Sequence, residues 1–198
     1  MSDPAIALLE FDSISAGIVS ADAMVKTSPI GSIYAGTAHP GKYLVFVGGD
    51  TASVEIALTT GRQLGGSHVT DWVFLADIHP DVMAAVVGNA DTAALTAEAL
   101  GIVETSTVAA AIDAADAGVK AADVMVSSVR LADGLGGKGF VLFSGVVAEV
   151  EAAVESATTR VEPHGKLVRS DVIAQLHEEM AENLEAGLGF LRRVGTRG

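Results

Sequence analysis

Histidine is the residue type in this chain best suited to bind a metal or carry a proton, and His39 is the most informative of the five histidines. It lies in the turn Ala38-His39-Pro40-Gly41. Pro40 pushes the residue before it toward an extended conformation, and Gly41 permits positive φ, so His39 should lie near a hairpin tip. Three such imidazoles converging on a symmetry axis could bind zinc or a similar borderline metal. A solvated loop histidine that lines an opening is the alternative.

Catalytic chemistry finds little support in the rest of the chain. The sequence has no phosphate-binding loop, no nucleophile elbow and no His–Glu pair at helical metal-binding spacing. The run Gly134-Leu135-Gly136-Gly137 is too short for a dinucleotide fingerprint and lies in a predicted hairpin. Cysteine is absent, which excludes disulfides and thiolate metal sites. We predict that the protein is not an enzyme and carries no cofactor, except for a possible metal held by His39.

Two pairs of charged residues occupy matching places in the two halves of the chain. Glu10 and Glu104 lie inside apolar strands, where a buried carboxylate needs hydrogen-bond donors such as backbone or hydroxyl groups. Lys26 and Lys120 close two matching helices. They either complement the helix C-terminus or reach across an edge to a neighbouring assembly along their apolar stems.

These residues are positioned by a tandem duplication. Residues 7–26 recur as 101–120 at a shift of 94 positions, and residues 41–49 recur as 137–145 at a shift of 96. The difference of two indicates a loop insertion. A repeat of about 95 residues predicts two small domains or two lobes of one body.

Each repeat predicts the order strand, helix, strand, strand, helix, strand. This is the split β-α-β arrangement of ferredoxin-like folds, so the fold class is α+β with two tandem copies. The strands expected in the first copy are 5–11, 31–37, 42–48 and 69–77. A helix capped by Ser13 should carry an apolar stripe of Ile14, Ile18, Ala21 and Val25. The strands expected in the second copy are 100–105, 123–132, 139–144 and 166–169.

The predicted boundaries are a first domain at 1–87, a linker at 88–98, a second domain at 99–170 and a tail at 171–198. Apolar residues in the tail recur at helical spacing from Asp171 to Val194, opposite a Glu-rich face. This predicts an amphipathic helix that docks on its own chain, on a neighbouring copy or on a cargo protein. Docking within its own assembly is the interpretation we favour.

Bulk composition points to an oligomer outside the membrane. Apolar residues make up 49% of the chain, yet no apolar run approaches the roughly 20 residues that span a bilayer. The start of the chain lacks the features of a secretory signal, and a cytoplasmic location is expected. A net charge of −13 argues against nucleic-acid binding. A unit of about 95 residues cannot bury so much apolar surface by itself, so we expect an obligate oligomer. Mutual burial of two lobes is the alternative.

The repeated motifs resemble those of tandem-domain shell proteins of bacterial microcompartments. The resemblance rests on Gly101-Ile-Val-Glu-Thr105, Ala21-Asp-Ala-Met-Val-Lys26, Ala115-Asp-Ala-Gly-Val-Lys120, Gly136-Gly-Lys138 and Ile78-His-Pro80. It implies a homotrimeric, pseudohexameric tile with a central opening for metabolites. Such tiles join other shell proteins, and possibly cargo, in the cytoplasmic compartment shell. Lys26 and Lys120 match edge lysines, while 38–41 and 134–137 match the loops near the opening.

The similarity is greatest to members from propanediol-utilising compartments, which carry cysteine at the position of His39. Three such thiolates hold an iron–sulfur cluster there, and this chain has no cysteine to offer. Two other functions stay open at this point. One is a soluble regulatory protein that binds a ligand on a ferredoxin-like scaffold, and the other is an electron-transfer or metal protein that uses His39.

Overall fold

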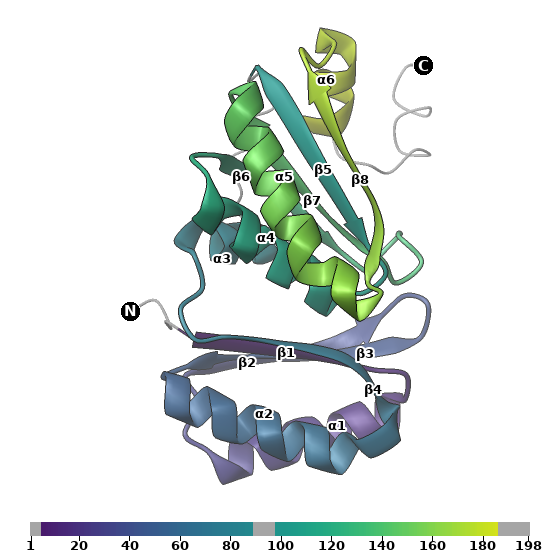
Figure 1. The fold of residues 1–198 in the computed structure, drawn as a ribbon. Helices are drawn as coiled ribbons and strands as arrows, with labels where there is room; N and C mark the ends of the chain where they lie inside the picture. Colours follow the sequence, from purple (N-terminus) through teal and green to yellow (C-terminus); the bar gives the residue numbers. More distant parts are fainter. Residues whose placement is uncertain (1–4, 89–97, 186–198) are drawn as a thin grey trace.

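The computed structural model describes residues 5–88 and 98–185, which form two domains of the same topology (Figure 1). The first consists of β1 (Ala5–Phe11), α1 (Ile14–Thr27), β2 (Ser32–Ala38), β3 (Lys42–Gly49), α2 (Thr51–Gly65) and β4 (Val69–Leu75), followed by α3 (Pro80–Val86). The second consists of β5 (Ala99–Thr105), α4 (Val108–Ala121), β6 (Met125–Leu131), β7 (Gly139–Gly145), α5 (Val147–Val161) and β8 (Leu167–Ala174), followed by α6 (Glu178–Glu185).

Both domains contain a four-stranded antiparallel sheet. The strand order is β2-β3-β1-β4 in sheet 1 and β6-β7-β5-β8 in sheet 2, so the predicted ferredoxin-like arrangement is confirmed in each half. The N-terminal caps of the first helices also correspond in the two domains. Ser13 caps α1 by accepting a hydrogen bond from the Ala16 amide, and Thr107 caps α4 through the Ala110 amide.

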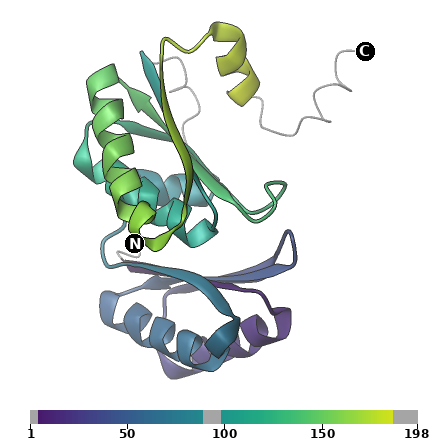
Figure 2. The same ribbon diagram turned by 45° about the vertical axis from the view of Figure 1, so that its right-hand side comes forward.

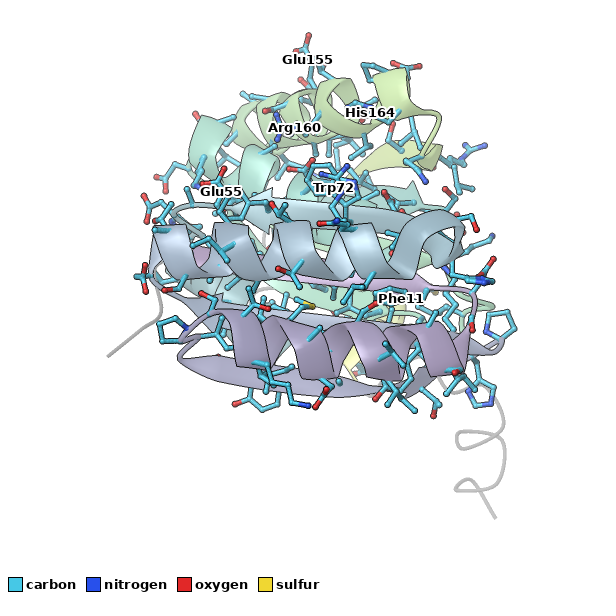
Figure 3. The ribbon with its side chains drawn as sticks, turned by 90° about the horizontal axis from the view of Figure 1, so that it is seen from below. Phe11, Glu55, Trp72, Glu155, Arg160 and His164 are labelled. Carbon is cyan, nitrogen blue, oxygen red and sulfur yellow. The ribbon has the colours of Figure 1, made fainter. Side chains whose placement is uncertain are left out.

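The core of the first domain lies between sheet 1 and the two helices α1 and α2. These helices lie side by side across one face of the sheet (Figure 3). Leu9, Phe11, Met24, Val47 and Val54 are all fully buried there. Small residues let the helices approach closely: a Cβ at Gly61 would lie 2.6 Å from the sulfur of Met24.

The opposite face of sheet 1 is covered by the second domain, which stands on it in Figure 1. One continuous apolar cluster joins Ile6 and Leu8 of β1 to Val108 and Ile112 of α4, and Val82 of α3 belongs to it. We call this contact between sheet 1 and the second domain the inter-domain seam. Between this seam and the rest of the second domain, ten of the fourteen residues of α4 are buried, whereas only four of the fourteen residues of α1, its repeat partner, are buried in the chain.

Two expectations about helices need correction. In α1 the residues buried in the chain are Gly17, Ser20, Ala21 and Met24. Most of the predicted stripe is exposed instead, including Ile14 at 44% and Ile18 at 52%. Helical periodicity identified an apolar face but could not say what covers it.

The tail also differs from the prediction. Residues 171–174 extend strand β8, which pairs with β5 as far as Ala174 opposite Ala99, so they are not helical. Helix α6 begins only at Glu178 and packs on the free face of sheet 2 through Ala181, near Leu100 and Leu142 (Figure 2). It therefore docks on its own chain. The remainder of the predicted helix, and residues 89–97 of the predicted linker, lie outside the described residues.

Within the described ranges, no helix combines the length and apolar character needed to cross a membrane.

Candidate functional site

The two β-hairpins that follow the first helix of each domain point to the same side of the molecule, and their tips lie close together (Figure 2). The His39 amide donates to Oδ1 of Asp133 at 3.0 Å, and His39 Nδ1 lies 3.4 Å from the same oxygen. Lys42 Nζ donates to the Gly137 carbonyl at 3.0 Å. The predicted loops 38–41 and 134–137 are therefore neighbours in one chain.

Strand register shows that Asp133 occupies the place of His39 in the repeat. Gly36 and Leu44 align with Glu10 across sheet 1, and Arg130 and Phe140 align with Glu104 across sheet 2. Gly36 therefore corresponds to Arg130, and Leu44 corresponds to Phe140. The two extra residues of the second hairpin must lie in its loop. The sequence comparison had placed 134–137 on 38–41 and so missed Asp133, although counting 94 positions from His39 leads to it.

The second hairpin tip depends on glycine for its shape. Gly134, Gly136 and Gly137 all have positive φ. Gly137 also faces the first loop, where an added Cβ would lie 2.9 Å from Cδ of Pro40. The side chains of His39 and Asp133 are 83% and 70% exposed, so the polar groups at this tip face solvent in a single chain.

Beneath the loops, Glu10 lies fully buried at the inter-domain seam. Its Oε1 accepts a hydrogen bond from the Ala109 amide at 2.6 Å, and Lys42 Nζ lies 2.7 Å from Oε2. Burial raises the pKa of Glu10 above its usual value, while the bonds from Lys42 and Ala109 oppose that shift. The predicted backbone hydrogen bond is thus confirmed, and Lys42 is a partner that the sequence did not reveal.

Glu104 keeps only half of this arrangement. Lys138 Nζ, the repeat partner of Lys42, lies 2.8 Å from its Oε1. The side chain of Glu104 is 34% exposed, and within the described part of the chain no backbone amide donates to it. The carboxylate therefore lies at the free surface of sheet 2 with acceptor capacity to spare.

The seam also uses one of the two matched lysines. Lys120 Nζ donates to Oδ2 of Asp116 at 2.7 Å and to the carbonyl of Asp77. The same Asp116 accepts from the His79 amide at 2.8 Å. Lys26 instead forms an exposed pair with Asp22. Of the two lysines, Lys26 has its side chain more open to a neighbour, at 71% against 41% exposure.

Three of the other histidines have structural or surface positions. His79 caps α3 by accepting from the Asp81 amide, and His177 likewise accepts from the Glu179 amide before α6. His68 pairs with Asp12 at 2.8 Å on the surface. No group of three or more metal-ligating side chains gathers anywhere in the described part of a single chain.

A groove of about 400 Å³ runs along the outside of the seam, lined in part by Trp72, Arg160 and His164 (Figure 3). Its charges are already engaged. Arg160 Nε contacts both oxygens of Asp113, at 3.0 and 2.9 Å, although burial still raises the pKa of that carboxyl. Lys166 lies 3.4 Å from Asp71. Of these two ion pairs, only Lys166–Asp71 joins the two domains, because Arg160 and Asp113 both belong to the second domain.

The sequence of the chain matches the family model of the BMC domain twice, over residues 5–78 and 99–176. The chain belongs to the BMC-domain family of bacterial microcompartment shell proteins. It is 38% identical to the shell protein PduT of Citrobacter freundii over 183 residues, which cover 92% of this chain and 98% of PduT. A solved microcompartment protein from Desulfitobacterium hafniense DCB superposes with a TM-score of 0.78 at 35% identity, covering 90% of this chain and 98% of that one.

Single-domain relatives match half of the chain. The carboxysome shell protein CsoS1C of Halothiobacillus neapolitanus is 40% identical over 93 residues, which cover 46% of this chain and 92% of CsoS1C. The chain is therefore a structural shell protein with two BMC domains, and it assembles with itself and with other shell proteins. Pseudohexameric trimers with a pore are typical of such tandem members. These similarities give no support to a ligand-binding regulator.

Proposed function

We propose that three copies of the chain close into a pseudohexameric tile by repeating the inter-domain seam between copies. The observation that carries this proposal is the difference in exposure between α1 and α4. Ile14 and Ile18 are 44% and 52% exposed, whereas their repeat partners Val108 and Ile112 are fully buried against sheet 1. In a ring, α1 of the next copy would cover sheet 2 as α4 covers sheet 1.

The helices after the last strand of each domain support the same contact. Helix α6 lies on sheet 2 in the place that α3 takes on sheet 1. Val82 of α3 is fully buried in the seam, whereas its counterpart Met180 of α6 is 51% exposed. Tyr34 of β2 is also exposed. A neighbouring copy would bury both, because α3 packs against β6, which is the repeat partner of β2.

Such a contact joins two different surfaces, so it makes either an open filament or a closed ring, depending on the rotation between copies. In the ring, each domain contacts the next through one seam, so three chains of two domains form six seams. Three of them lie within chains and three lie between chains. A ring that closes after six seams has the form of the pseudohexamers that are typical of the family.

In this ring, the hairpin tips face the central opening. The opening would be lined by Ala38, His39, Pro40 and Gly41 from one domain and by Asp133 with 134–137 from the other. His39 and Asp133 would then alternate around it. We propose that small metabolites pass here without a bound cofactor, and that His39 is the pore-loop residue to test for metal. Lys26 and Lys120 are proposed to contact neighbouring tiles at the edge.

Light scattering on the purified protein tests the tile directly. The expected result is a species of three times the chain mass across micromolar concentrations, and a threefold ring with a central opening under negative stain. A monomer at these concentrations would refute the proposal. Metal analysis of untagged protein tests the pore loop: a stoichiometric metal that is lost on His39→Ala would add a metal site to the opening.

A further inference from the structure

The polar contacts of the inter-domain seam have exposed counterparts elsewhere in the chain, and Glu104 is the most informative of these. Glu10 accepts a hydrogen bond from the Ala109 amide, the second amide of helix α4. The first four amides of a helix have no partner within the helix, so a carboxylate at this place satisfies one of them and interacts favourably with the helix dipole. Glu10 thus serves as a cap supplied by the other domain.

The same two groups recur at a shift of 94 residues and do not meet within the chain. Glu104 takes the place of Glu10, and Ser15 takes the place of Ala109 as the second residue of α1. Ser13 satisfies the Ala16 amide, as Thr107 satisfies that of Ala110. The Ser15 amide is therefore the α1 counterpart of the amide that Glu10 caps, and it lies on the helix whose apolar side is exposed.

We infer that Glu104 of one copy caps helix α1 of the next copy by accepting a hydrogen bond from its Ser15 amide. This rests on the proposed ring, and it names the carboxylate that fixes the position of one chain on another. The contact would bury Glu104, Lys138 would remain its counter-ion, and each ring would contain three such caps between chains beside the three formed by Glu10.

The charged groups around Glu104 differ from those around Glu10. On the neighbouring strand, Glu10 faces Asp71, whose charge adds to the rise in its pKa. Glu104 instead faces Arg169 on β8. The guanidinium of Arg169 is itself paired with Asp171, with 2.6 Å between Nε and Oδ2, so Lys138 is the cation that pairs with Glu104. Arg130 of β6 is the third cation of this region, because the strand register of sheet 2 aligns it with Phe140 and Glu104.

A second polar pair shows the same pattern independently. At the seam, the His79 amide donates to the nearly buried Asp116. The counterparts are His177, which likewise precedes the last helix of its domain, and Asp22, whose side chain is 58% exposed. In the ring, Asp22 of one copy would accept from the His177 amide of its neighbour. Both exposed acceptors therefore have their donors on the surfaces that the ring brings together.

Amide hydrogen exchange on fully trimeric protein tests the cap. In Glu104→Gln, the amides of residues 14–16 should exchange roughly tenfold faster, while those of 108–110 keep their wild-type rate. In the matched variant Glu10→Gln, the amides of 108–110 should be the ones affected. The dissociation constant of each contact between copies should rise about tenfold in Glu104→Gln, because a charge-assisted bond becomes a neutral one.

Wild-type exchange at 14–16 in trimeric Glu104→Gln would overturn the cap and leave the ring intact. A wild-type protein that is monomeric by light scattering would overturn the ring and the cap together. If Glu10→Gln fails to fold, the comparison of Glu104→Gln with wild type still decides, because Glu104 is partly exposed and its replacement leaves the buried seam unchanged.

Discussion

Truncation of Ile18 and of Ile112 should separate the stability of the chain from the stability of the ring. These residues occupy the same place on α1 and α4, and both are isoleucine. Ile112 is fully buried at the seam within the chain, whereas Ile18 is 52% exposed. The prediction is that Ile112→Ala destabilises the fold and that Ile18→Ala destabilises the association.

The magnitudes follow from burial. Deletion of a fully buried isoleucine side chain to alanine costs about 2–5 kcal/mol of unfolding free energy, which is the range expected for Ile112→Ala. Full burial of such a side chain contributes about 1.5–3 kcal/mol, and Ile18 has about half of that still to gain, or roughly 1 kcal/mol per contact. Three contacts give about 3 kcal/mol per ring, or roughly a hundredfold in the trimer dissociation constant.

Sedimentation velocity over a dilution series measures the association. Because the midpoint concentration of a monomer–trimer equilibrium varies as the square root of its dissociation constant, Ile18→Ala should shift the midpoint about tenfold upward. Urea unfolding at concentrations below that midpoint measures the chain alone, where Ile18→Ala should stay within about 1 kcal/mol of wild type.

An unchanged midpoint in Ile18→Ala would refute the claim that α1 is covered by a neighbour. Equal losses of chain stability in both variants would do the same, because they would mean that α1 and α4 are equally buried in one chain. Thr59→Ala on α2 serves as a surface control for handling and concentration errors.

Three further predictions concern the carboxylates and the opening. Lys42→Met leaves the buried Glu10 without its cation and should lower the unfolding free energy, measured in urea, by about 3–5 kcal/mol. Lys138→Met should lower the unfolding free energy of the dissociated chain far less, because Glu104 is partly exposed. Equal losses in the two variants would contradict this difference in burial. Because burial raises the pKa of Glu10 in the folded chain, its contribution to stability is full below pH 4.5 and declines as pH rises through the folded pKa. Glu10→Gln should therefore flatten this part of the stability–pH curve. A variant whose curve has the same slope as that of the wild type would refute this prediction. Asp133→Asn should raise the passage of an anionic substrate relative to a neutral one into assembled shells, measured with an encapsulated enzyme, and an unchanged ratio would exclude Asp133 from the opening.

The order of the strands and helices could be predicted because each repeat carries its own periodicity and turn residues. The N-cap Ser13 is a consequence of local chemistry, and the structure confirms it. The end of β8 could not be predicted in this way. Ile173, Leu176 and Met180 fit a helical spacing, but the backbone of β5 needs a partner strand as far as Ala99, and this pairing prevails.

The candidate site was predicted in part. His39 and the loop 134–137 were recognised from turn chemistry and repetition, and the structure places them side by side. Asp133 was missed because the two-residue insertion can be placed on either side of it until the strand register is known. The Glu10–Lys42 pair was missed for a different reason: a contact between residues on adjacent strands leaves no local pattern in the sequence.

Building the seam between sheet 1 and α4 inside one chain changes how a tile is assembled. In the proposed ring, three of the six seams form within chains in the course of folding, at a rate that does not depend on protein concentration. Only three bodies must then find one another by diffusion, where an equivalent ring of single-domain subunits would need six. Equilibrium assembly therefore follows the third power of free subunit concentration, and tiles of this kind can persist at dilutions where six-part rings would dissociate.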